Sequence, residues 1–171
     1  MKKRSIFLFL LIVIIVVLSC ASLRNISVAL ADNTVKLTQA DEEKILEYLD
    51  HKTDDIASAQ MGKMYSAFKL LGSNKDKLYI WVSKVEYLNI TGKLTHEGGD
   101  AVSLPVVLEI KKTDNGFNII SHKYPKDGKD YGKSLNKLFP SNIKYPTNEE
   151  RLTLDNTTKA RAEDDSGGDG L

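Results

Sequence analysis

Three histidines are the side chains in this sequence that could hold a metal ion or act as a general base near neutral pH. They are His51, His96 and His122, and they lie in three separate segments. Zinc sites commonly use a local pair, such as two histidines at i and i+4 or a Cys-x-x-Cys, and the sequence contains neither. The run His-Glu-Gly-Gly-Asp at residues 96–100 could form a cation-binding loop, but a solvated loop is the simpler interpretation. We therefore expect no metal site.

The sequence also lacks the motifs of nucleophilic catalysis and nucleotide binding. It contains no Gly-x-Ser-x-Gly, the turn that exposes a serine nucleophile, and no Gly-x-Gly-x-x-Gly or phosphate-binding loop. The formal net charge is +1, with 24 Lys and Arg against 23 Asp and Glu, so nothing suggests a nucleic-acid partner. These patterns predict a protein that is not an enzyme and binds neither a cofactor nor nucleic acid.

The N-terminus has the charge and hydropathy pattern of an export signal. Lys2, Lys3 and Arg4 precede an unbroken apolar run at residues 6–18, which matches the positive and apolar regions of a signal peptide. A buried core helix is a poor alternative, because the run has no polar stripe. The positive charges favour the cytoplasmic side, so we expect the rest of the chain outside the cytoplasm.

The end of this segment has three interpretations, which the sequence leaves open. In the first, the chain is cleaved after Ala29-Leu30-Ala31, which fits the small-x-small rule of a general signal peptidase. In the second, Val17-Leu18-Ser19-Cys20 resembles the lipobox of bacterial lipoproteins, where a diacylglyceryl group is attached to the thiol of the cysteine, here Cys20. In the third, the nineteen charge-free residues 5–23 stay in the membrane, since as a helix they reach roughly 28 Å. The protein is thus expected to be extracytoplasmic, either membrane-attached or secreted.

A capped helix is predicted at the start of the exported part. Thr38 is the N-cap, and Asp41 with the two glutamates after it places acids at the positive end of the helix. Ile45 and Leu49 mark one apolar face of this helix, which is expected to end near Asp50.

Period-two alternation then predicts four strands joined by tight turns. The strongest strand covers residues 77–88, the next alternates over residues 104–110, and residues 117–124 return after a turn at Asn115-Gly116. An earlier strand precedes these three. Pro105 has no N–H to donate, so its strand must lie at an edge or begin there.

The strand at residues 77–88 has an aliphatic face and an aromatic face. The aliphatic residues are Leu78, Ile80 and Val82. The aromatic residues are Tyr79, Trp81 and Tyr87. The alternation changes phase near Ser83, which indicates a bulge or a strand covered on both sides. The three aromatic side chains could form a partner-binding surface, or they could pack beneath the N-terminal helix.

The order of these elements predicts an α+β fold. The N-terminal helix packs on one face of a four-stranded antiparallel meander, and a short C-terminal helix follows at residues 131–139. The expected parts are a signal peptide or membrane anchor at 1–31, a linker at 32–36, an α+β globular domain at 37–146 and a flexible tail at 147–171.

Several turn and strand motifs carry a resemblance to a known family. They are Val106-Val107-Leu108, Asn115-Gly116, Tyr124-Pro125-Lys126-Asp127-Gly128, Tyr131 and Phe139-Pro140. Over residues 64–145 the chain resembles a small extracytoplasmic domain of Gram-positive bacteria. That domain is found in the tails of some beta-lactam-sensor-like membrane metallopeptidases and in free-standing secreted or lipoprotein relatives. The resemblance implies an accessory or sensory domain outside the membrane. It does not imply peptidase activity, because the zinc-binding His-Glu-x-x-His is absent.

The function expected from the sequence is a non-enzymatic binding or sensory module at the bacterial cell envelope. Its partners would be the membrane, through the N-terminal segment, and an envelope protein or cell-wall polymer. One alternative is an envelope hydrolase or inhibitor whose site is assembled only in the fold. A cavity that joins a histidine to an acid or a hydroxyl would be its signature. The other alternative is a structural envelope protein with residues 147–171 as a spacer.

Overall fold

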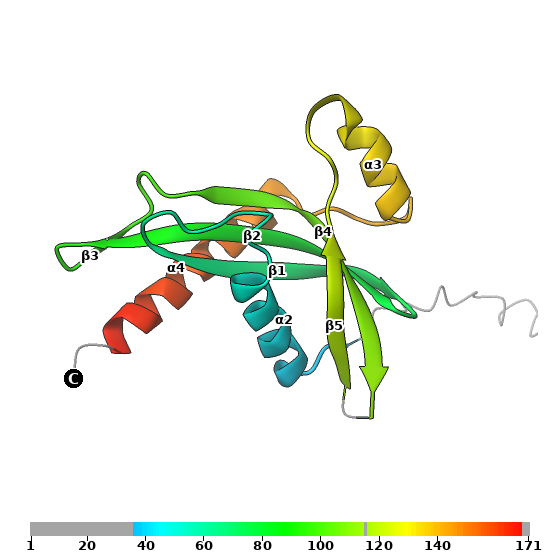
Figure 1. The fold of residues 1–171 in the computed structure, drawn as a ribbon, viewed down its shortest axis with the longest axis horizontal. Helices are drawn as coiled ribbons and strands as arrows, with labels where there is room; N and C mark the ends of the chain where they lie inside the picture. Colours follow the sequence, from blue (N-terminus) through cyan, green and yellow to red (C-terminus); the bar gives the residue numbers. More distant parts are fainter. Residues whose placement is uncertain (1–35, 115, 169–171) are drawn as a thin grey trace, which may run out of the picture. The chain divides into compact units, whose positions relative to one another are not determined.

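A computed structural model describes residues 36–114 and 116–168 of the chain (Figure 1). The chain divides into two units, Met1–Asn33 and Thr34–Leu171, and every described residue belongs to the second. The lipidation candidate Cys20 and the cleavage candidates Ala29 and Ala31 lie outside the described residues. Within residues 36–114 and 116–168, no helix has both the length and the apolar character needed to cross a bilayer.

Helix α2, Gln39–His51, begins at the predicted cap. The Thr38 hydroxyl accepts the Asp41 backbone N–H at 3.2 Å, and the Asp41 carboxylate accepts the Thr38 backbone N–H at 3.1 Å. This capping box satisfies N–H groups that would otherwise have no partner at the start of the helix. Ile45 and Leu49 are buried, as their spacing predicts.

An antiparallel sheet follows α2. Its strands are β1 (Lys63–Asn74), β2 (Lys77–Ile90), β3 (Lys93–Thr95), β4 (Ala101–Thr113) and β5 (Gly116–Lys123). The spatial order is β1-β2-β4-β5, which confirms the predicted four-stranded meander, and β3 pairs with the end of β2. The sequence did not predict β3, because three residues are too few for an alternation signal. Strand β4 ends at Thr113 and β5 begins at Gly116, and these two residues pair, so the chain reverses direction where the sequence predicts a turn; Asn115 itself lies outside the described residues.

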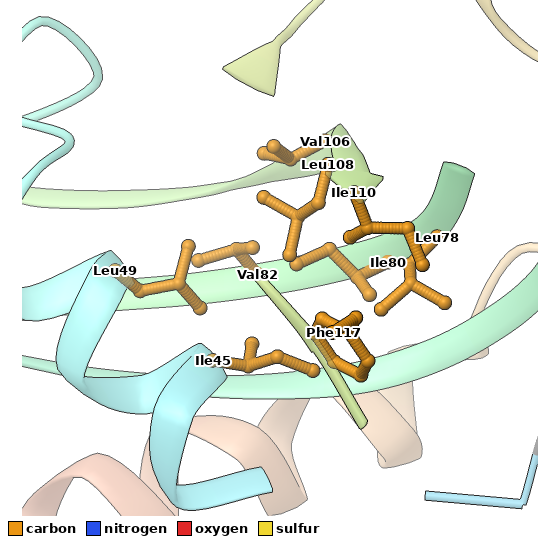
Figure 2. Close-up of a cluster of buried hydrophobic side chains, with 9 residues drawn as sticks. All are labelled: Ile45, Leu49, Leu78, Ile80, Val82, Val106, Leu108, Ile110 and Phe117. Carbon is orange, nitrogen blue, oxygen red and sulfur yellow. The ribbon is translucent and has the colours of Figure 1, made fainter. Parts of the chain in front are cut away.

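Helix α2 covers one face of the sheet (Figure 1). Figure 2 shows Ile45 and Leu49 of α2 pointing toward the aliphatic side chains of β2 and β4, with Phe117 of β5 beside them. The predicted aliphatic face of β2 forms the centre of this cluster, and its three members, Leu78, Ile80 and Val82, are all 0% exposed.

The C-terminal helices cover the opposite face of the sheet. Helix α3, Tyr131–Leu138, follows a 3-10 turn at Gly128–Asp130 and ends before Pro140, as predicted. Phe139 packs against the β2–β4 pair, and the longer helix α4, Asn148–Gly168, packs farther along β1 and β2. Strand β2 is therefore covered on both sides, which explains why its apolar residues do not keep to one face. The register shifts lie at Leu70/Gly72 and Glu109/Ile110 instead.

Helix α4 corrects the prediction that residues 147–171 form a flexible tail. The helix runs through residue 168 and buries Leu154, Thr158 and Ala162 against the sheet. A second capping box starts it, because the Glu150 carboxylate accepts the Thr147 N–H at 2.8 Å and the Thr147 hydroxyl accepts the Glu150 N–H at 3.2 Å. The buried residues recur every four positions, but only one of them is a large apolar side chain, so the stripe is weak in the sequence.

Candidate functional site

A cavity of about 440 Å³ opens on the α4 side of the sheet. Ser83, Val85 and Tyr87 of β2 and the first residues of β4 form its floor, and α4 forms one wall. The other side of the cavity lies along β4 where β5 does not reach, because the β4–β5 pairing begins only at Val107↔Lys123. The groove therefore runs beside a free edge of the sheet.

The register of β4 shows which backbone groups face this free edge. The Ile110 N–H donates to the Asp76 carbonyl and the Glu86 N–H to the Asp100 carbonyl, both at 2.8 Å. In the antiparallel ladder between these two bonds, the even-numbered residues of β4 direct their N–H and C=O groups toward β2, and the odd-numbered residues direct theirs away from it.

The outward groups upstream of Val107 belong to Ala101, Ser103 and Pro105. Among the described residues, no backbone group hydrogen-bonds to the outward N–H or C=O groups of these three residues. The β4–β5 pairing begins only at Val107, and the hydrogen bonds of the turns and loops involve other residues. Ala101 and Ser103 are exposed and each offer a donor and an acceptor, whereas Pro105 is buried and has no N–H. The prediction that the Pro105 strand lies at an edge or begins there is wrong for the strand as a whole, because β4 begins at Ala101 and lies between β2 and β5 in the sheet. At Pro105 itself β4 pairs with β2 alone, so the missing N–H breaks no ladder bond there.

Glu86 holds the start of this edge in place. One carboxylate oxygen accepts the N–H groups of Gln60, Met61 and Gly62 at 2.8, 2.6 and 2.5 Å. The other oxygen accepts the Asp100 N–H at 3.1 Å. These donors, chiefly Met61 and Gly62, stabilise the charged carboxylate and lower the pKa of Glu86 to about 2. The side chain thereby fixes the residue immediately before the open edge of β4.

The polar side chains in the floor of the groove satisfy one another. The Ser83 hydroxyl, in a residue only 1% exposed, donates to the Asp155 carboxylate at 2.5 Å. The Trp81 indole N–H donates to the Ser103 hydroxyl at 2.8 Å, which draws the indole toward β4. These bonds leave the backbone of Ser103 outward and unpaired within the described part of the chain.

Arg151 brings an unpaired positive charge beside the groove. Its guanidinium carbon lies 4.2 Å from the centre of the Trp81 ring, a cation–π contact, and Tyr145 meets the same ring edge-on at 6.1 Å. Within the described residues the guanidinium has no ion pair and no hydrogen bond, and its Nε is buried without a partner. Unpaired polar atoms of this kind are uncommon in folded proteins. The arrangement presents a cation held by stacking instead of by a carboxylate.

His96 lines the same cavity as Ser83, Asp155 and Ser103, so the cavity does join a histidine to an acid and to hydroxyls. Within the described residues the His96 imidazole makes no hydrogen bond, however, and its ring instead meets Tyr87 edge-on at 6.1 Å, while the His96 backbone carbonyl accepts the Gly99 N–H at 3.1 Å. The Ser83 proton is directed at Asp155 and not at a histidine. The geometry does not prepare a serine nucleophile, which needs a base within hydrogen-bonding distance.

His122 belongs to a separate group. Its Nδ1 lies 3.0 Å from the Tyr48 hydroxyl, and its Nε2 lies 2.9 Å from the nearer Asp55 oxygen. Burial, and then the Asp55 charge, raise the pKa of Tyr48, so the phenol keeps its proton. This chain of side chains connects α2, the turn after it and β5. Neither Tyr48 nor His122 lines the groove beside α4.

The histidines therefore do not meet. His51 ends α2, His96 lies in the groove and His122 is on β5. In the described part of the chain, no three His, Cys, Asp or Glu side chains lie close enough together to hold a metal ion.

The aromatic surface predicted on β2 is not open to a partner. Tyr79, Trp81 and Tyr87 lie on one face of the strand as predicted, but they are only 5%, 5% and 6% exposed. They are covered from the C-terminal side of the chain, by Phe139 and α4, and not by the N-terminal helix, which packs on the other face. Both predictions about their packing need this correction, because neither included α4.

Sequence reasoning missed Arg151 and Asp155, the α4 residues that shape the groove. It placed both in a flexible tail and so did not consider them as site residues. The available signal was the Thr-x-x-Glu capping box at residues 147–150, which marks a helix start.

Comparison of the chain with protein-family models, curated proteins and solved structures gives no match.

Proposed function

We propose that this protein is an exported, non-enzymatic binding module at the bacterial cell envelope, and that its groove receives an extended segment of a partner protein. The export signal at residues 1–31 and the resemblance to an accessory or sensory domain support the location. The groove supports the mode of binding.

One observation carries the proposal: the N–H and C=O groups of Ala101 and Ser103, which have no partner among residues 36–114 and 116–168, lie beside a cavity. An incoming strand satisfies such groups by extending the sheet, and alternate side chains of that strand enter the neighbouring groove. Pro105 limits the new ladder at one end, because it has no N–H to donate. The docked segment is therefore short.

The binding edge can be tested by removing a single outward donor. Ala101→Pro deletes an N–H that points away from β2, so it leaves the β2–β4 ladder intact. Ala101→Val keeps the donor and is the matched control at the same exposed position. Equal melting temperatures for the two variants would show that the substitutions leave the fold intact.

A display library of random linear seven-residue peptides is the probe, with the full-length chain in detergent as the bait. We expect peptides enriched on the unmodified chain to bind the Ala101→Val protein normally and the Ala101→Pro protein at least tenfold more weakly. Peptides that bind both variants equally, or a selection that enriches none, would overturn the proposal.

A further inference from the structure

We propose that the segment bound in the groove is acidic and carries two carboxylates four residues apart. This inference rests on the proposed function. In the bound state, the guanidinium of Arg151 binds one carboxylate and the ammonium of Lys159 binds the other. The backbone of the segment pairs with the outward N–H and C=O groups of Ala101 and Ser103.

The first step concerns the charges along α4. Arg151, Asp155 and Lys159 follow one another at intervals of four residues, so they share one side of the helix. The Asp155 carboxylate already accepts the buried Ser83 hydroxyl. Arg151 has no carboxylate partner among the described residues, and Lys159 has only a loose, exposed contact with Glu163 at 3.6 Å. Two cations are thus available to a ligand, one on each side of an acid that is already bonded.

The second step concerns direction. Leu154 packs against Trp81, which pairs with Pro105, whereas Ala162 packs against Val85, which pairs with Ala101. Helix α4 therefore runs opposite to β4. Arg151 lies toward the Pro105 end of the open edge, and Lys159 lines the cavity together with Ala101.

The third step concerns spacing. Eight residues of helix separate Arg151 from Lys159, which is about 12 Å of rise. Four residues of an extended strand cover about 13 Å, and residues i and i+4 of a strand point to the same side. A docked strand can therefore place one carboxylate at each cation. The side chain midway between them faces Asp155 and has to be neutral or basic.

Guanidinium suits this role better than ammonium at the Trp81 end. A planar guanidinium stacks on the indole and still presents two terminal nitrogens to a carboxylate. A bound carboxylate would also supply the counter-ion that Arg151 lacks in the described part of the chain.

Two synthetic peptides of Thr and Val test the spacing, both seven residues long and capped at each end. One carries Glu at positions 2 and 6, and the other carries Glu at positions 2 and 5, so that composition and charge are the same. Only the first peptide presents both carboxylates on one side of a strand. Binding is measured by fluorescence anisotropy with the full-length chain in detergent.

We expect the 2,6 peptide to bind about fivefold more tightly than the 2,5 peptide, and the difference to shrink in high salt. Arg151→Gln and Lys159→Gln should each reduce the preference, and Arg151→Lys should restore part of it. Melting temperatures of these variants exclude a loss of fold.

The outcomes separate the two proposals. If both peptides bind equally and Ala101→Pro abolishes both, the acidic spacing is wrong and the binding edge stands. If neither peptide shows any binding that Ala101→Pro removes, the acidic spacing is wrong, and if the display library also enriches nothing, both proposals fail.

Discussion

Strand β2 carries two charged residues inside the protein, and each is held by backbone or hydroxyl groups. Lys84 and Glu86 are both 0% exposed. The Lys84 ammonium donates to the Thr53 carbonyl at 2.9 Å and to the Thr53 hydroxyl at 2.8 Å, at the end of α2, where the helix dipole favours a cation. Burial lowers the pKa of Lys84, whereas the N–H donors lower that of Glu86. These residues connect the centre of the sheet to the loops on the α2 side.

The Glu86 carboxylate should make stability depend on pH. Its pKa falls from 4.5 to about 2 on folding, so its contribution is fully present above about pH 4.5 and is lost as the pH falls through about 2. We expect Glu86→Gln to lower the melting temperature at pH 7, and the difference from the unmodified chain to shrink between pH 4.5 and pH 2. Thermal denaturation, monitored by circular dichroism at several pH values in this range, measures the difference in melting temperature.

The control for this prediction is Glu47→Gln, which removes the same charge from the exposed side of α2. Its melting temperature should follow that of the unmodified chain. A difference for Glu86→Gln that stays constant from pH 7 to pH 2 would show that the carboxylate charge is not what holds the two loops.

At the scale of elements, α4 forms the second layer of the core on its side of the sheet. Leu154 packs with Ala67 and Trp81, and Ala162 packs with Tyr65 and Tyr87 farther along the helix. Its mean hydropathy is low because its solvent side is polar and its buried residues are few. Tertiary packing therefore contributes more to the stability of this helix than the intrinsic helix propensity of its residues does.

A matched pair of substitutions tests how far α4 is packed. Leu154 is 8% exposed and Leu152 is 59% exposed, and both lie on the same helix. We expect Leu154→Ala to reduce the free energy of unfolding by about 2–4 kcal/mol, since it leaves a cavity, and Leu152→Ala to change it by less than about 0.5 kcal/mol. Urea denaturation measures both, and an equally small effect at the two positions would mean that the segment is a loose tail after all.

At the scale of the whole domain, the layers on the two faces are joined around the edge of β1. Asp50 of α2 and Arg161 of α4 form an ion pair at 2.9 Å. The Asp50 carboxylate also accepts the Ser66 N–H at 2.8 Å, and Arg161 donates to the Ser66 carbonyl at 2.6 Å. One outward pair of backbone groups on β1 is thus capped by both helices. This protects the edge from pairing with another chain, in contrast to the open residues of β4.

A double-mutant cycle measures this connection. Asp50→Ala, Arg161→Ala and the double variant should show a coupling of about 1–3 kcal/mol, because the two side chains are partly buried and share the Ser66 backbone. The exposed pair Lys63–Asp165 also joins β1 to α4, and the same cycle there should give less than about 1 kcal/mol. Equal couplings for the two pairs would show that the Asp50–Arg161 contact has no special place in the fold.

The sequence by itself determined the elements whose signals are local. The Thr38 cap, the Asn115-Gly116 turn and the alternation of Leu78, Ile80 and Val82 each depend on residues within a few positions of one another. They were enough to predict the α+β meander. Turn chemistry and strand periodicity act over such short distances, so they can be read without the fold.

The tertiary structure alone decided what covers the second face of the sheet and which edge stays open. Trp81 and Arg151 are far apart in the sequence, and only packing brings the guanidinium onto the indole. The open groups of Ala101 and Ser103 result from where β5 stops pairing, which no local pattern records. The burial of a side chain and the exposure of a strand edge depend on contacts between residues that are far apart in the sequence. The groove and the Arg151 guanidinium beside it, which has no ion pair among the described residues, could therefore not be predicted from the sequence.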